Sequence, residues 1–355
     1  MPTFRRGEVV RILEARPGLQ RVEVALADGA ARAYVLTGLT GEVGPGERVI
    51  VNTTAVELGL GTGGWHVVHW SLDRDEFIAP GPGHIMKLRY TSLQADTGSA
   101  EEFHPELGGA DTIDGMPVVH VPLHSQVPAA VVGVRSVRPD ARIAYVMTDG
   151  AALPLALSDL VAAMRDRALI DTTVTAGHAF GGDHEAVSAP AALLAARVAG
   201  RADVAIVAMG PGIVGTGSRF GHTGVEAPTW LSAAADLGGT PIAALRVSFA
   251  DPRDRHRGLS HHSATALGRL GSARATVVLP AIGGDEERRL RTEIDEAGIA
   301  ARHEVVTAPA PDVLGAFAGH GLAVGSMGRP ASADPVLFLA AGAAGALAAD
   351  RIPSR

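Results

Sequence analysis

An alternation of short apolar runs with helical segments, from about residue 116 to the C-terminus, constrains the fold most strongly. The apolar runs, among them PVVHVPL, ARIAYVM, DVAIVAM and ATVVLPA, lack the apolar–polar alternation of half-exposed strands, which indicates strands covered on both faces. Helical segments such as SDLVAAMRDRAL and PAALLAARVAG separate them. This order predicts a doubly wound, mostly parallel, Rossmann-like α/β domain over residues 116–355.

Residues 1–75 have a different pattern. Five short, Val-rich runs, from GEVVRIL to WHVVHW, are separated by turn sequences such as ADGA and GEVGPGE. This spacing predicts a small β-barrel of the OB or SH3-like kind. Residues 76–115 carry Gly and Pro at both ends and little regular pattern, so we expect a connector there.

Composition narrows the classes of function. The chain has no cysteine, which excludes disulfides and thiolate metal sites. A formal net charge of −7 and 4% aromatic residues count against a nucleic-acid partner. The longest apolar run, VLFLAAGAAGALAA, is too short to span a bilayer, and the first residues lack the apolar core of a signal peptide. We therefore expect a cytoplasmic protein with no membrane partner, in which a homo-oligomer remains open.

Polar segments follow the strands predicted for the α/β domain. Because the carboxyl ends of parallel strands meet at one edge of a sheet, we expect a ligand crevice there. Half of the fourteen histidines fall in these segments, namely His124, His178, His184, His222, His256, His261 and His262.

The segment GHAFGGDHEAVS joins a predicted strand to a helix. Its His and carboxylate side chains are ligand types of zinc, manganese and iron sites. We predict His178 and His184 as metal ligands, and His178, Asp183 and Glu185 as catalytic residues. The alternative is that these side chains hydrogen-bond the loop and cap the helix.

The segment GPGIVGTGSRFGHTG contains the spacing GxGxxG after an apolar strand, but no helix opens directly after it. NAD or FAD is therefore not expected. Closely spaced glycines can instead expose backbone N–H groups to an anion, or can simply form a turn. The predicted anion-binding residues are Gly210, Gly212, Gly215, Gly217 and Arg219, and the adjacent His222 is a catalytic candidate.

The segment RDRHRGLSHHSATALGRLG opens a helix at Ser260. His261 and His262 occupy its first turn, where the helix dipole disfavours imidazolium, and neutral imidazole can ligate a metal or accept a proton. The alternatives are an anion clamp and a solvated basic loop. The clamp would use Arg253, Arg255 and Arg257.

Two further binding candidates lie elsewhere. Lys87 is the one lysine of a chain that otherwise uses Arg, although it could be an ordinary surface lysine. His124 follows a predicted strand, whereas His120, within that strand, is expected to pack in the core.

Several long phrases, including PGHIMKLRYTSLQ, GHAFGGDHEAVSA, GTGSRFGHTG, GLSHHSATALG and SMGRPASADPVLFLAAGAAGALA, resemble one actinobacterial family. This family is known as DUF3866 and has no assigned function. The resemblance covers nearly the whole chain and implies an actinobacterial source. It implies no activity, substrate or catalytic residue.

The residues themselves favour an enzyme, metal-assisted or histidine-based and hydrolase-like, acting on a small phosphate- or carboxylate-bearing molecule. Its metal would be zinc, manganese or iron. One alternative is a non-catalytic, nucleotide- or anion-binding regulatory protein. Another is a nucleic-acid-associated protein that uses the barrel.

Overall fold

The protein is described by a computed structural model over residues 2–61 and 63–354. The chain separates into two compact units, Met1–Gly98 and Ser99–Arg355. The boundary between them falls inside the segment 76–115, which we expected to be a connector.

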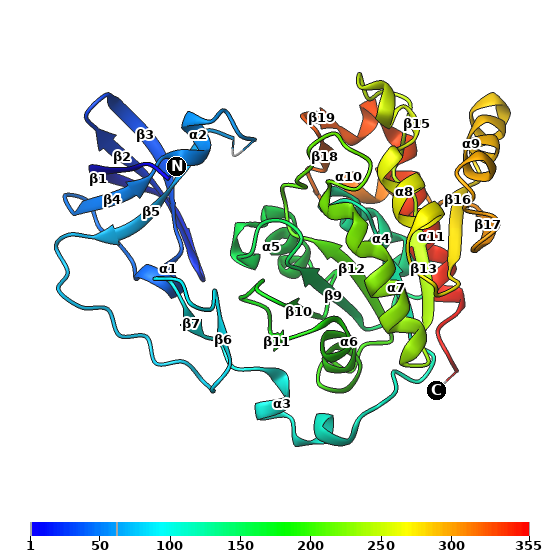
Figure 1. Ribbon diagram of the computed structural model, residues 1–355, viewed down its shortest axis with the longest axis horizontal. Coiled ribbons are helices and arrows are strands. Elements are labelled where there is room, and N and C mark those ends of the chain that lie inside the picture. The colour runs from blue at the N-terminus through cyan, green and yellow to red at the C-terminus, as the bar shows by residue number, and fades with distance from the viewer. Residues whose placement is uncertain (1, 62, 355) are drawn as a thin grey trace. The chain divides into compact units, whose positions relative to one another are not determined.

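The first unit contains a closed five-stranded barrel (Figure 1). Its strand order is β1-β2-β3-β5-β4, with β3 and β5 parallel, which is the order of an OB-fold barrel. Valine side chains from the strands fill its interior. The strands are β1 (Phe4–Arg16), β2 (Leu19–Leu26), β3 (Gly29–Val35), β4 (Arg48–Asn52) and β5 (Trp65–Ser71). Helical turns α1 (Thr37–Thr40) and α2 (Thr54–Glu57) and a short hairpin of β6 (Met86–Lys87) and β7 (Ala95–Asp96) complete the unit.

The second unit is built on an eight-stranded sheet of order β11-β10-β9-β12-β8-β13-β16-β17, in which every pair is parallel. The sheet comprises β8 (Pro117–His120), β9 (Ile143–Thr148), β10 (Thr172–Ala176), β11 (His184–Ala186), β12 (Val204–Met209), β13 (Thr240–Ala244), β16 (Thr276–Pro280) and β17 (Glu304–Ala308). Most residues of its central strands are fully buried, as their apolar runs predicted.

Helices cover both faces of this sheet, which confirms the doubly wound α/β prediction (Figure 1). One face carries α4 (Val127–Val137), α5 (Asp159–Asp166), α10 (Val313–Gly319) and α11 (Pro335–Asp350). These helices share a core with the buried side chains of β8, β9 and β12 that point toward them. The other face carries α6 (Ala189–Val198) and α7 (Ala227–Asp236), followed by α8 (His261–Arg269) and α9 (Gly284–Glu296). A four-residue helix, α3 (Ala100–Phe103), precedes the sheet. Among the described helices, none is long and apolar enough to cross a membrane.

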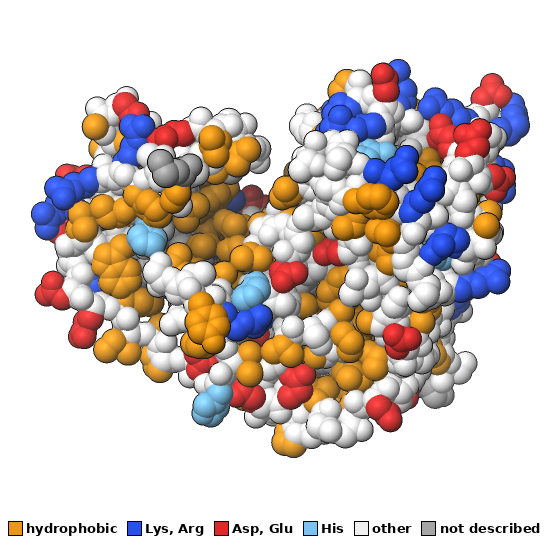
Figure 2. All heavy atoms as spheres, in the orientation of Figure 1, with side chains coloured by type: hydrophobic (Ala, Val, Ile, Leu, Met, Phe, Trp, Pro, Cys, Tyr) orange, Lys and Arg blue, Asp and Glu red, His pale blue; other side chains and the backbone are white. Residues whose placement is uncertain are grey.

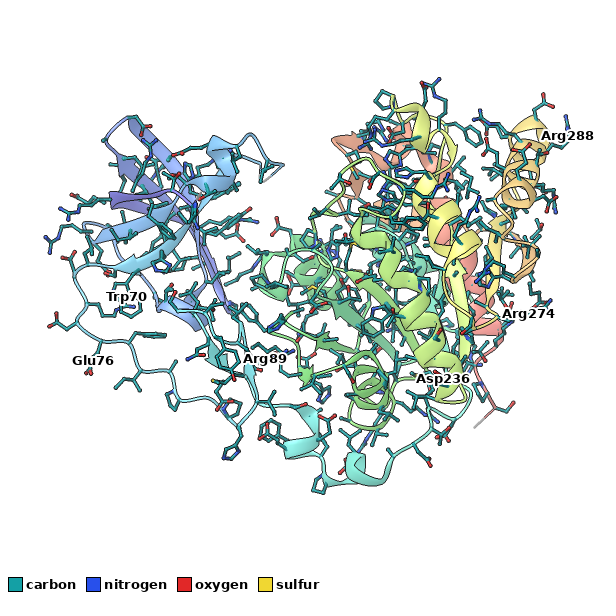
Figure 3. The ribbon with its side chains drawn as sticks, in the orientation of Figure 1. Trp70, Glu76, Arg89, Asp236, Arg274 and Arg288 are labelled. Carbon is teal, nitrogen blue, oxygen red and sulfur yellow. The ribbon has the colours of Figure 1, made fainter. Side chains whose placement is uncertain are left out.

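The parallel strands direct all their carboxyl ends to one edge of the sheet. The chain leaves β8 toward one face, through α4, and leaves the adjacent β13 toward the other, through α8. In α/β proteins, ligands commonly bind at the carboxyl edge of the sheet where such a reversal occurs. Asp236, at the end of α7, and Arg274, ahead of β16, mark the opposite edge (Figure 3).

Helices α11 and α4 pack closely against each other and against the strands that end at this carboxyl edge. Glycine lets the two helix backbones approach, because a Cβ at Gly345 would collide with the carbonyl oxygen of Ala130. A Cβ at Gly133 would likewise collide with the carbonyl oxygen of Gly342.

We predict that Gly345→Ala destabilises the protein by about 1–3 kcal/mol, because the added methyl group overpacks the helix contact. The matched control is Gly319→Ala at the end of α10, where nothing lies within 4 Å of the added Cβ. The control is expected to be neutral or stabilising by up to about 1 kcal/mol, since alanine favours helix. Urea denaturation of both variants measures the difference, and equal stability of the two would contradict the packing argument.

Candidate functional site

Four histidines and one arginine converge at the carboxyl ends of β12 and β13. His222 precedes the short helix η4 (Thr223–Glu226), which connects the loop after β12 to α7. Arg246 lies between β13 and β14 (Val247–Ser248). His256 ends η5 (Asp254–His256), and β15 (Gly258–Leu259), which pairs with β14, returns the chain to the start of α8 at His261 and His262. We refer to Arg246, His222, His256, His261 and His262 as the His/Arg cluster.

The four imidazoles of the His/Arg cluster form one connected group of ring contacts. The rings of His222 and His262 are stacked, with centroids 3.8 Å apart and planes inclined by 7°. The ring of His261 meets them edge-on, at 5.4 Å from His222 and 4.4 Å from His262. The ring of His256 lies 5.0 Å from both His261 and His262. At the upper right of Figure 2, a histidine side chain lies among several Lys or Arg side chains on the surface of the second unit.

The guanidinium of Arg246 is the buried charge of the cluster, since the residue is only 3% exposed. Its Nη1 donates a hydrogen bond to Nδ1 of His262 at 3.0 Å, and its backbone N–H donates to the Ser263 hydroxyl. Among the described residues, the carboxylate closest to this guanidinium belongs to Asp251, whose Oδ2 lies 4.0 Å from Nη2 of Arg246. A buried charge requires close pairing to offset its lost hydration, so Arg246 lacks a matched anion.

Asp251 is already committed to another arginine. Its two carboxylate oxygens accept hydrogen bonds of 2.9 and 2.8 Å from Nε and Nη2 of Arg253. The Arg329 guanidinium lies 3.6 Å from Asp251 and 3.1 Å from Asp334, which also accepts from the Ser248 hydroxyl. Three guanidinium groups therefore face two carboxylates, and the group deepest in the structure is the one left unmatched.

Burial, together with this surplus of positive charge, keeps the neighbouring imidazoles neutral. Burial, reinforced by Arg246, lowers the pKa of His262 to about 2 and that of His256 to about 3. Burial, with His222 and the arginines adding repulsion, lowers the pKa of His261 to about 4. Burial also lowers the pKa of His222. Burial lowers the pKa of Arg246 itself to about 10, so the guanidinium remains charged at neutral pH.

Several nitrogen atoms of these imidazoles are buried without a hydrogen-bond partner. His222 is 5% exposed, and neither of its ring nitrogens makes a well-formed hydrogen bond in the described structure, although the backbone of Arg219 lies close enough to counter, in part, the lowering of its pKa by burial. Nε2 of His261 is likewise without a partner among the described residues. Nε2 of His120, at the end of β8, is also unpartnered, and His120 and His262 both line the same small cavity. Because buried polar groups are nearly always hydrogen-bonded, these nitrogens are available to a ligand or to water.

A metal shared by His222, His261 and His262 would need these side chains to rearrange. Their ring nitrogens lie within 4.8 Å of one another, and three imidazoles can hold zinc. However, a metal lies in the plane of each ligating ring, whereas the rings of His222 and His262 are nearly parallel. A metal-bound imidazole also normally donates its second N–H to an acceptor, whereas Nδ1 of His262 accepts from Arg246. The arrangement is better suited to an anion.

The predicted residues of the segment 178–185 lie elsewhere. Strand β10, which precedes them, is two positions from β12 and four positions from β13 in the sheet, or about 10 and 19 Å at the usual spacing of strands. Asp183 pairs with Arg165 at 2.7 Å and accepts from the backbone of Thr173. Glu185 accepts hydrogen bonds from Thr175 and Gly181. The ring of His184 contacts His104, and the backbone N–H of His178 donates to Asp149. The structure does not bring this group to the His/Arg cluster.

The glycine-rich loop leads directly into His222. Gly210 is buried, whereas Gly212, Gly215, Gly217 and Arg219 are exposed. Val214 and Thr223 pair through their backbones, and Gly215 bridges to His222, so the loop forms a hairpin where a dinucleotide site would open a helix. Of the three predicted arginines, Arg253 pairs with Asp251, whereas Arg255 and Arg257 are exposed on the same loop as His256.

His124 and Lys87 are both buried away from solvent. Nδ1 of His124 lies 3.0 Å from the Tyr145 hydroxyl, and its Nε2 lies 2.7 Å from Oγ of Ser158, the N-cap of α5. These contacts tie β8 to α5, which is a structural task. Lys87 belongs to the first unit, on β6.

Two residues that sequence reasoning did not select stand out. Arg246 is embedded in the apolar run TPIAALRVS, where an isolated arginine is itself unusual. Glu226 ends η4, and both of its oxygens lie 2.8 Å from the single hydroxyl of Thr148. Burial raises the pKa of Glu226 to about 7, a value suited to proton transfer at neutral pH.

Comparison with known proteins identifies the family. A family model described as a protein of unknown function, DUF3866, matches residues 32–345. The chain belongs to the DUF3866 family. Comparison with curated proteins gave no match. The matched DUF3866 region includes every member of the His/Arg cluster and all strands of the parallel sheet.

We predict that His120 makes the stability of the protein depend on pH. Burial lowers the pKa of His120 to about 4, whereas the pKa of a histidine in the unfolded chain is about 6.5. Between these values the unfolded chain binds a proton that the folded chain does not, so stability falls as the pH falls. Replacement His120→Leu should reduce this fall by up to about 1.4 kcal/mol per pH unit. Urea denaturation at several pH values across the window tests this, and identical slopes for variant and wild type would contradict it.

Proposed function

We propose that the protein is a hydrolase-like enzyme that binds the phosphate or carboxylate group of a small molecule at the His/Arg cluster. The observation that carries this proposal is the Arg246 guanidinium, which is 3% exposed and has no carboxylate closer than 4.0 Å among the described residues. An anion placed beside it would supply the missing partner. Charge-assisted hydrogen bonds of this kind are among the strongest in proteins.

The surroundings of Arg246 support an anion over a cation. The cluster lies at the N-terminus of α8, where the helix dipole stabilises negative charge. Arg253 and Arg255 add to the positive potential that acts on Arg246 and His261. The neutral imidazoles can each donate one N–H to an anion oxygen.

The same imidazoles support chemistry beyond binding. His222 and His261 have nitrogens that no protein group occupies, so they are available to a bound substrate. A neutral imidazole is a base as well as a hydrogen-bond donor. The hydrolase-like activity proposed here uses these side chains and requires no shared metal. A non-catalytic anion-binding protein would have the same cluster but would not turn over a substrate.

Calorimetric titration with inorganic phosphate and with acetate tests the binding step. We expect the wild type to bind one or both anions in the presence of a chelator, and Arg246→Gln to bind at least about 30-fold more weakly, because a buried charge contact contributes several kcal/mol. Arg288→Gln is the matched control, since Arg288 lies exposed on α9 (Figure 3) and should retain wild-type affinity.

Three results would contradict the proposal. The first is equal anion affinity of wild type and Arg246→Gln. The second is loss of binding on chelation, together with about one equivalent of zinc, manganese or iron in the untagged protein. The third is anion binding without hydrolysis of any member of a panel of phosphoesters, acyl phosphates and carboxylic esters, which would support the binding protein in place of the enzyme.

A further inference from the structure

We propose that His222 is a covalent catalytic residue that accepts a phosphoryl group from an acyl phosphate or a related mixed anhydride. This inference rests on the anion site proposed above and names the substrate class that the site would process. Imidazole is one of the side chains that enzymes use as nucleophiles.

The first argument is the availability of the His222 ring. It is 5% exposed and stacks on the first turn of α8 against His262, and among the described residues the backbone of Arg219 is the group whose hydrogen bond influences the ring, so at least one nitrogen is unoccupied. A neutral imidazole can therefore attack through one nitrogen while the other keeps its proton. A serine or threonine hydroxyl needs a separate base to become a nucleophile, whereas a neutral imidazole does not.

The second argument is that the other nucleophiles of the cluster are engaged. The Ser260 hydroxyl lies 2.7 Å from His256 and caps the backbone of His262. The Ser263 hydroxyl accepts from the Arg246 backbone. The Asp251 carboxylate is held by Arg253. Besides His222, His261 has one unpartnered ring nitrogen, Nε2, whereas both ring nitrogens of His222 lack a close side-chain partner among the described residues, so we assign the nucleophile to His222.

The reaction balances without an external acid, base or metal. A lone pair of His222 attacks phosphorus, an N–P bond forms, and the P–O bond to the acyl group breaks with its electron pair leaving on the carboxylate. The phosphorylated ring is then an imidazolium that still carries its N–H. Water attacks phosphorus, the N–P pair returns to the ring, and dihydrogen phosphate and neutral His222 result.

The leaving group follows from the charges around the ring. The neighbouring imidazoles are neutral, so none of them can protonate a departing alkoxide, and the Glu226 carboxyl group is engaged with the Thr148 hydroxyl. A carboxylate departs without protonation, which favours an acyl phosphate over a simple phosphate monoester. Arg246 and the α8 dipole would stabilise the negative charge on the transferring phosphoryl oxygens.

The test uses acetyl phosphate as the phosphoryl donor. The wild type is mixed rapidly with it, quenched in alkali and examined by intact-protein mass spectrometry. We expect a gain of one phosphoryl group that survives alkali and is lost in acid, which is the behaviour of phosphohistidine. His222→Asn should lose this adduct, and the exposed His320→Asn should keep it. His222→Gln provides a second replacement, and phosphate titration of both variants verifies that the site is folded.

Each remaining outcome is decisive. Phosphate binding without any adduct overturns the covalent role of His222 and leaves the proposed anion-binding function standing. An adduct that persists in His222→Asn, for example on His261, overturns the assignment of the nucleophile. An adduct that is stable to acid or labile to alkali excludes phosphohistidine. If the wild type neither binds phosphate nor reacts with acetyl phosphate, both this inference and phosphate binding by the proposed site are overturned. In that case only acetate binding would preserve the proposed function.

Discussion

One buried positive charge organises the candidate site. Arg246 places its guanidinium where only 3% of the residue is exposed, and the nearest carboxylate prefers Arg253. Removing such a charge from water costs on the order of several kcal/mol unless it is paired. The hydrogen bond to the neutral imidazole of His262 compensates part of this cost. The anion that we propose to bind at the cluster would compensate the rest of this cost.

The parallel sheet explains why these side chains meet. The loops after β12 and β13 come from strands on either side of β8, and all three strands end at the same edge. The loop after β12 delivers His222, and the β14–β15 hairpin folds the next loop back so that His256 and the first turn of α8 approach Arg246. Close packing of α4 and α11 holds β8 and β13 from the opposite face. A site of four imidazoles and one guanidinium is thus a product of topology.

The prediction from sequence was strongest where periodicity was clear. The apolar runs predicted the parallel sheet and the barrel, and the Ser260 cap and His261–His262 pair were placed correctly at the start of α8. Strand order could not be derived, because it depends on packing between distant segments. For that reason His178 and His184 were grouped with histidines that lie several strands away.

The most informative residue of the cluster was missed for a related reason. An isolated arginine in an apolar run is unusual, but the run does not show whether the Arg246 side chain turns inward or outward. Glu226 was missed because a glutamate at the start of a helix is ordinarily exposed, whereas here it lies against Thr148. Signals of this kind exist only once the loops are placed in space.

The most direct measurement is the protonation and tautomer of His262, from the ring ¹⁵N resonances of labelled histidine at neutral pH. Because Nδ1 of His262 accepts a hydrogen bond from Arg246, the account predicts a neutral ring with its proton on Nε2. It also predicts that added phosphate shifts the resonances of His222 and His262. A proton on Nδ1 of His262, an imidazolium, or resonances that do not respond to phosphate would contradict a buried arginine awaiting an anion.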